Sequence, residues 1–115
     1  MKLTVYHLKN CDTCKKSIKA LEASGHELTL IDVRADGVSK NDLEKFMMGV
    51  GIEALLNTRS TTWRELDDRY KSDMSEAKAL SLMGEHPTLI KRPVISDANQ
   101  ITVGWNKEVQ TRWLT

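Results

Sequence analysis

The sequence predicts an α/β fold with the order β-α-β, a helical insert, then β-β-α. Three observations carry this prediction. Short apolar segments rich in β-branched residues stand near both ends of the chain, the middle has helical periodicity, and two cysteines lie where the first strand gives way to a helix. The 115 residues, 40% hydrophobic and 29% charged, have ordinary globular composition, so we expect a single domain spanning residues 1–115.

The charge balance and hydropathy limit the possible partners. A formal net charge of +1 gives no electrostatic reason to expect nucleic acid or a membrane surface as a partner. No segment approaches the roughly 18 apolar residues of a membrane span, and polar residues interrupt the N-terminus too early for a signal peptide. We therefore expect a cytoplasmic protein and a monomer.

The first β-α-β unit is predicted from two strand-like segments, Leu3–Leu8 and His26–Val33. Between them, residues at helical spacing are Cys14, Ile18 and Leu21. Gly25 suits the position just past a helix end. A crossover of this length joins parallel strands, so the two strands should pair in parallel.

The insert begins with a helix that Ser39 and Asp42 should open as a capping pattern. Gly49 and Gly51 should end this helix. Its predicted apolar face consists of Leu43, Phe46, Met47 and Val50.

Two further helices are predicted in the more polar middle of the chain. Thr62 and Glu65 should form a capping box around Trp63, and Asp73 with Glu76 should open the next helix. The buried face of that later helix is predicted to hold Ala77, Leu80 and Met83, with Gly84 and Pro87 closing it.

The last unit contains two short strands and a helix. The segments Leu89–Ser96 and Ile101–Val103 are predicted strands joined by a turn. Asn106 should cap a final helix that buries Val109 and Trp113.

This order is that of a thioredoxin-like fold with helices inserted between its halves. A C-x-x-C motif after the first strand of a β-α-β unit supports the assignment. Pro93 supports it further, because a proline inside a central strand would lose a ladder hydrogen bond. In this fold a proline at that point is characteristically cis and packs against the cysteines, so we expect a cis Pro93.

Four ordered segments carry a more specific resemblance, which covers nearly the whole chain. They are Asn10-Cys11-Asp12-Thr13, Leu56-Asn57-Thr58-Arg59-Ser60-Thr61-Thr62-Trp63-Arg64-Glu65-Leu66, His86-Pro87 followed by Leu89-Ile90-Lys91-Arg92-Pro93, and Val103-Gly104-Trp105. The chain resembles the arsenate-reductase-like proteins, a family that also includes the Spx-type transcription regulators. The residues of its motifs are most similar to those of the small bacterial reductase-like members, which are suspected of glutathione-dependent thiol chemistry.

The resemblance implies a set of site residues. Cys11 matches the family's nucleophile, while Arg59 and Arg92 match two anion-binding arginines. The substrate site would also contain Asn10, Thr13 and Pro93. Glutathione-linked arsenate reductases carry a third arginine after the last strand, and here Trp105 stands near that place.

The residues themselves favour a reactive thiol at Cys11. A helix N-terminus stabilises a thiolate, although a more stable thiolate is also a weaker nucleophile. Positioning of an anionic substrate by arginine forks must therefore supply more of the rate. Lys15 and Lys16 in the first helical turn oppose the helix dipole, so they either favour an anion or are solvated surface residues. Asp12 can help to cap the helix.

Cys14 is expected to be catalytic together with Cys11: it would resolve a mixed disulfide at Cys11 by forming an intramolecular bridge. The alternative is that Cys14 is a small buried residue. A metal site is not expected, because no histidine has ligand-like spacing to the cysteines.

The sequence thus predicts a thiol-dependent oxidoreductase acting on a small anionic substrate. We expect no bound cofactor, with glutathione or a thioredoxin or glutaredoxin system as the reductant. The alternatives are a redox-sensing regulator that binds RNA polymerase, as Spx does, and a true arsenate reductase.

Overall fold

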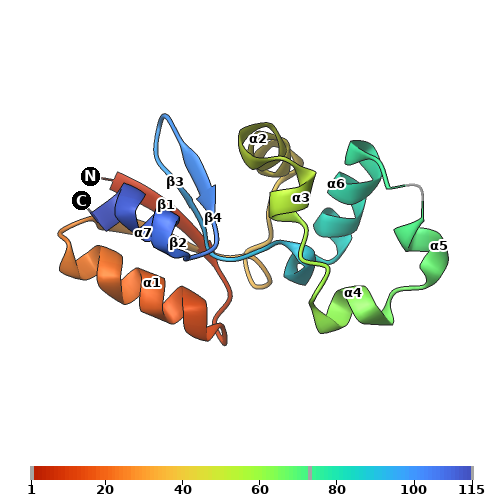
Figure 1. Ribbon diagram of the computed structural model, residues 1–115, viewed down its shortest axis with the longest axis horizontal. Helices are drawn as coiled ribbons and strands as arrows, with labels where there is room; N and C mark the ends of the chain where they lie inside the picture. The colour runs from red at the N-terminus through yellow and green to blue at the C-terminus, as the bar shows by residue number, and fades with distance from the viewer. Residues whose placement is uncertain (1, 73, 115) are drawn as a thin grey trace.

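The computed structural model describes residues 2–72 and 74–114 and contains one four-stranded sheet (Figure 1). Its strands, in the order β2-β1-β3-β4, are β2 (Glu27–Asp32), β1 (Lys2–His7), β3 (Val94–Ser96) and β4 (Ile101–Val103). The pair β1 and β2 is parallel, whereas β3 is antiparallel to both β1 and β4. The predicted β-α-β and β-β-α units are therefore confirmed, and with them the thioredoxin-like fold.

Two helices accompany the sheet at the end where the chain termini lie (Figure 1). They are α1 (Asp12–Ala23) and α7 (Lys107–Leu114), and they share a core with β1 and β3. The predicted burial of Val109 and Trp113 is confirmed. Trp113 Nε1 donates to Thr102 Oγ1 at 2.7 Å, which joins α7 to β4.

The helical insert occupies the other half of the molecule (Figure 1). It consists of α2 (Lys40–Val50), α3 (Ile52–Leu55), α4 (Thr61–Glu65), α5 (Asp68–Lys71), α6 (Glu76–Glu85) and the 3-10 turn η1 (Pro87–Leu89). Its core joins the sheet through Tyr6, whose ring meets that of Phe46 edge-on with centroids 4.7 Å apart. Within the residues described, no helix has the length and apolar character needed to cross a membrane.

Helix ends with local capping signals agree with the sequence. Ser39 Oγ accepts from the Asp42 amide at 3.1 Å, and Asn106 Oδ1 accepts from the Val109 amide at 2.9 Å. Gly51 ends α2 with φ +82°, a conformation that favours glycine. The other expected terminator, Gly49, instead lies inside α2.

The prediction of a capping box at Thr62 is wrong. Ser60 caps α4, because its Oγ accepts from the Trp63 amide at 3.1 Å and donates to the Asn57 carbonyl at 3.0 Å. Those two bonds fix the turn, so the helix begins at Thr61. The Thr62 hydroxyl is instead bonded to Thr88 at 2.7 Å.

The predicted start and buried face of α6 also need correction. Ser75 caps the helix by accepting from the Lys78 amide at 3.1 Å, while the expected Asp73 cap lies outside the described residues. Ala77 is exposed and Leu80 only half-buried, and Gly84 lies inside the helix. The fully buried positions are Ala79, Leu82 and Met83, so of the predicted face only Met83 is right.

The predicted strand Leu89–Ser96 is correct only from Val94 onward. Pro93 cannot donate to a ladder, and the residues before it pair with the insert instead of the sheet. Leu56 and Ile90 form an isolated antiparallel bridge. The Arg92–Pro93 peptide bond is cis.

Candidate functional site

Cys11 lies in the turn between β1 and α1. Its amide donates to the Leu8 carbonyl at 3.1 Å, which turns the chain as it leaves the strand. Its Sγ accepts from the Cys14 amide at 3.3 Å, so the cysteine side chain is itself the N-cap of α1, and the expected cap Asp12 is the first helical residue. The half-buried sulfur is thereby held against the donor end of a helix, where an anionic sulfur is stabilised.

Cys14 lies beneath it and is fully buried, with 0% of its surface exposed. The pKa of the Cys14 thiol is raised to about 12, first by burial and then by its hydrogen bond to Cys11 and by the charge that Cys11 can carry. A backbone hydrogen bond at Leu8 and the charge of Arg92 partly offset this rise. Neither cysteine is in a disulfide. Because its pKa is raised, the Cys14 thiol is protonated at neutral pH.

Arg92 is held by the carbonyls that precede it. Its Nη1 donates to Thr88 O and to Ile90 O, both at 3.0 Å. Its Nε is buried and has no hydrogen-bond partner within the part of the chain that the structure describes. A buried N–H without a partner is costly, and this one belongs to a guanidinium whose charge reaches Cys14. The guanidinium therefore places a positive charge near the buried thiol.

Arg59 is positioned less tightly than Arg92. It is exposed, and its amide donates to Asn57 Oδ1 at 3.1 Å in the turn before α4. This turn is attached to the Arg92 segment at two points, because the Asn57 amide donates to Leu89 O at 2.7 Å and the Thr62 hydroxyl meets that of Thr88. The two predicted arginines thus stand on neighbouring, mutually bonded segments.

The hydroxyl pair of Thr62 and Thr88 was not singled out from the sequence. Thr88 contributes its hydroxyl to the Arg59 segment and its carbonyl to Arg92. No periodicity marks such a residue, because its two partners come from different elements. In the sequence, Thr62 is marked only by its place in the Thr61-Thr62-Trp63 segment, and Thr88 only by its position four residues before Arg92.

The remaining predicted residues differ in placement. Asn10 and Thr13 are exposed at the turn and first turn of α1. Trp105 is half-buried and packs against the core that α1 and α7 share. At the position where a third arginine was considered, the chain therefore has a packing residue. Across the described residues, no group of three or more His, Cys, Asp or Glu side chains could hold a metal ion.

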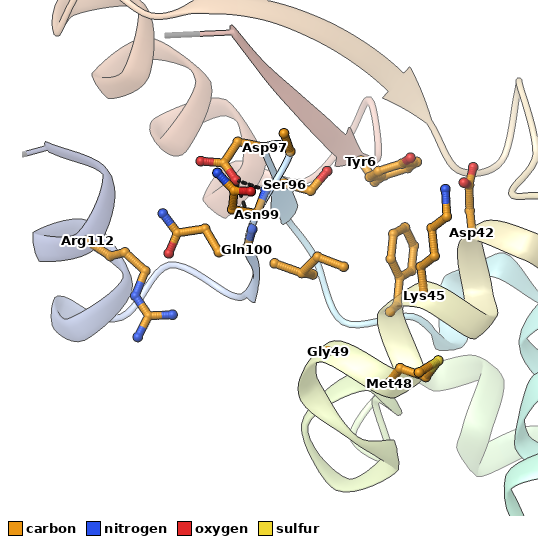
Figure 2. A pocket seen from close by; sticks show the side chains of 13 residues that line it. Tyr6, Asp42, Lys45, Met48, Gly49, Ser96, Asp97, Asn99, Gln100 and Arg112 are labelled. Carbon is orange, nitrogen blue, oxygen red and sulfur yellow. Dashed lines mark hydrogen bonds between the residues drawn. The ribbon is translucent and has the colours of Figure 1, made fainter.

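A cavity of about 740 Å³ lies between α2 and the turn that joins β3 to β4, and it is lined by neither cysteine. Figure 2 shows Lys45 and Met48 of α2 on one side and the turn containing Asn99 and Gln100 on the other. Tyr6 lies at this cavity, and its pKa is raised to about 12 by burial, followed by the charge of Asp42 and a hydrogen bond to it. The thiols and the cavity are therefore separate features.

A thioredoxin-like fold with a half-buried sulfur at the first helix N-terminus and an arginine before a cis proline defines a class of thiol proteins. A model of the ArsC family matches residues 6–112. The chain belongs to the ArsC family.

Relatives within the family differ in what they are named for. An uncharacterised protein of Haemophilus influenzae is 43% identical over 106 residues, covering 92% of this chain and 93% of the relative. The arsenate reductase of Escherichia coli is 29% identical (81% and 67% covered), and the global transcriptional regulator Spx of Bacillus subtilis is 28% identical (97% and 86% covered).

Solved structures agree with the fold. The YffB (PA3664) protein superimposes with a TM-score of 0.92 at 33% identity, covering 98% of this chain and 99% of that one. An arsenate-reductase-related protein of Brucella melitensis gives a TM-score of 0.76 at 36% identity, covering 97% and 92%.

We predict that alkylation will separate the two cysteines. Iodoacetamide at pH 8 should label the native protein at Cys11 alone, because Cys14 is buried and its raised pKa leaves almost no thiolate. Peptide mass spectrometry after brief labelling reads the site, and Cys14 should react only after unfolding in guanidinium. The Cys11→Ser variant is the matched control and should take up no native label. Native labelling of Cys14 at a rate comparable with Cys11 would contradict the geometry.

Proposed function

We propose that this protein is a thiol-dependent oxidoreductase in which Cys11 is the nucleophile. The observation that carries the proposal is the sulfur at the N-terminus of α1, with a buried thiol one helical turn away and the charge of Arg92 acting on that buried thiol. The Cys11 thiolate attacks one sulfur of a substrate disulfide. The sulfur–sulfur bond breaks, a Cys11 mixed disulfide forms, and the second substrate sulfur leaves as a thiolate that takes a proton from water.

Arg92 binds the anionic part of the substrate in this proposal. Two carbonyls already fix its Nη1, so the guanidinium loses little freedom on binding. Arg59, on the exposed neighbouring turn, contributes a second and more mobile cation. Asn10 and Thr13, which are exposed close to Cys11 in the chain, would contact the substrate, and the cis Pro93 would orient the backbone after Arg92.

An external thiol completes the cycle. The burial of Cys14 disfavours attack by this residue, because burial raises the pKa of its thiol and leaves little of the thiolate that would have to attack. Glutathione, or a thioredoxin or glutaredoxin, therefore attacks the mixed disulfide, is itself oxidised and releases the Cys11 thiolate.

Disulfides are favoured over arsenate as substrates. Trp105 stands near the place where the third arginine of glutathione-linked arsenate reductases is expected, and it packs into the core instead of offering a donor. An oxyanion would thus lack one of its expected cationic partners. The same two-cysteine arrangement would also suit a redox switch of the Spx kind.

We predict that Arg92 confers selectivity for anionic disulfides. Arg92→Ala should lower kcat/KM for glutathione disulfide about 10- to 150-fold, the loss of one charge-assisted hydrogen bond, and should affect uncharged hydroxyethyl disulfide far less. Steady-state turnover with thioredoxin as reductant measures both. Lys91→Ala, which removes the exposed neighbouring cation, is the control and should change neither. Equal losses on both substrates would indicate a structural role, and no disulfide turnover by the unaltered protein would refute the proposed function.

We predict that a glutathione adduct on Cys11 will persist without external thiol. After treatment with glutathione disulfide, intact mass spectrometry should show one adduct that decays equally slowly in the unaltered protein and in Cys14→Ser, because the buried Cys14 thiol stays protonated. Loss of the adduct with formation of a Cys11–Cys14 disulfide would contradict external resolution. Such bridging without turnover would favour the redox switch.

A further inference from the structure

The segment around the reactive thiol carries a local excess of positive charge. Residues 9–19 contain four lysines and one aspartate, a formal charge of +3, whereas the whole chain carries +1. The remainder of the chain is therefore net negative. The four cations are Lys9, Lys15, Lys16 and Lys19, and all are exposed.

These lysines are not used inside the molecule. Between residues 2 and 114, Asp73 excepted, the one ion pair within 4.0 Å joins Arg69 to Asp67. Asp12 and Glu22 are the only carboxylates on α1, and neither approaches a lysine to that distance. The ammonium groups are thus available to an outside partner.

The arrangement does not serve helix stability. Lys15 and Lys16 lie in the half of α1 nearest its N-terminus, where a cation opposes the dipole. Lys15 and Lys19 are four residues apart, so they repel each other across one turn, at a cost of about 0.2–0.5 kcal/mol. A feature that costs stability and uses no internal partner points to a use at the surface.

The helix gathers the lysines on the turns that follow the thiol. Lys15, Ile18 and Lys19 are neighbours on one face of α1, and Lys15 comes four residues after the N-cap residue Cys11. Lys15, Lys16, Ile18 and Lys19 line a shallow trough of about 410 Å³. This surface has an apolar centre and a cationic rim, and its first residue, Lys15, comes four residues after Cys11.

We propose that this trough is the docking surface for the acidic face of a dithiol protein that reduces the Cys11 mixed disulfide. The inference rests on the proposed function and adds its partner. Charge complementarity indicates an acidic partner. The trough is open and its cations are spread over more than one turn, which suits a protein surface more than a small ligand.

Docking brings the two sulfur sites together. A thiolate of the partner attacks the Cys11 sulfur, forming a disulfide between the proteins and expelling the bound group as a thiolate. The second partner thiol, after losing its proton to water, attacks the partner's own sulfur in that bond. The Cys11 thiolate is released, and the partner leaves oxidised to its internal disulfide.

The test compares two reductants of the same chemistry. Hydroxyethyl disulfide first loads the protein: the Cys11 thiolate attacks it, a mixed disulfide forms at Cys11, and one 2-mercaptoethanol is released. The mixed disulfide is then reduced by an acidic thioredoxin or by uncharged dithiothreitol, and second-order rate constants are measured at 20 mM and 500 mM salt. The variant is Lys15→Glu with Lys16→Glu and Lys19→Glu. The matched control reverses three exposed lysines on α2 and α7, namely Lys40→Glu, Lys45→Glu and Lys107→Glu.

We predict that only the α1 variant will lose fast reduction by thioredoxin. Its rate constant should fall at least about tenfold at low salt and converge on that of the unaltered protein at high salt. Its reduction by dithiothreitol should change less than about twofold, which shows that Cys11 still works. Equal slowing of both variants, or no advantage of thioredoxin over dithiothreitol in the unaltered protein, overturns the docking surface. Failure to load Cys11 at all counts against the proposed function instead.

Discussion

The hydrogen bond from the Cys14 amide to Cys11 Sγ is the interaction on which the rest of the site depends. Through this bond the side chain of Cys11, which follows β1, becomes the N-cap of α1. A thiol is an unusual cap, because serine, threonine, aspartate and asparagine are preferred. Using sulfur there places the proposed nucleophile at the donor end of α1 and sets Cys14 one turn further on, inside the core.

The second constraint is the pairing between two distant parts of the insert. The Leu56–Ile90 bridge and the Lys91 amide, which donates to Leu55 O at 2.8 Å, hold the segment before Pro93 in an extended form outside the sheet. That segment supplies the carbonyls that bind Arg92. Strand pairing there would have used the same carbonyls in a ladder, so the position of Arg92 depends on β3 beginning only at Val94.

Features governed by a few neighbouring residues could be predicted from the sequence. The caps at Ser39 and Asn106 follow from local patterns, and so does the order of strands and helices along the chain. The strand extent at Leu89 and the buried face of α6 could not, because both depend on which distant segment packs against them. For Cys14 the sequence left two roles open, since burial is a property of the assembled core. The bond between Thr62 and Thr88 joins residues 26 apart and has no local signature.

The central claim is that one sulfur both caps α1 and performs the chemistry. The most direct measurement is the free energy of unfolding in urea together with disulfide turnover for Cys11→Ser and Cys11→Ala. Serine can accept the same amide, so its variant should lie within about 0.5 kcal/mol of the unaltered protein, while alanine should lose about 1 kcal/mol. Neither should turn over disulfides. An alanine variant as stable as the serine one, or turnover by either, would contradict the account.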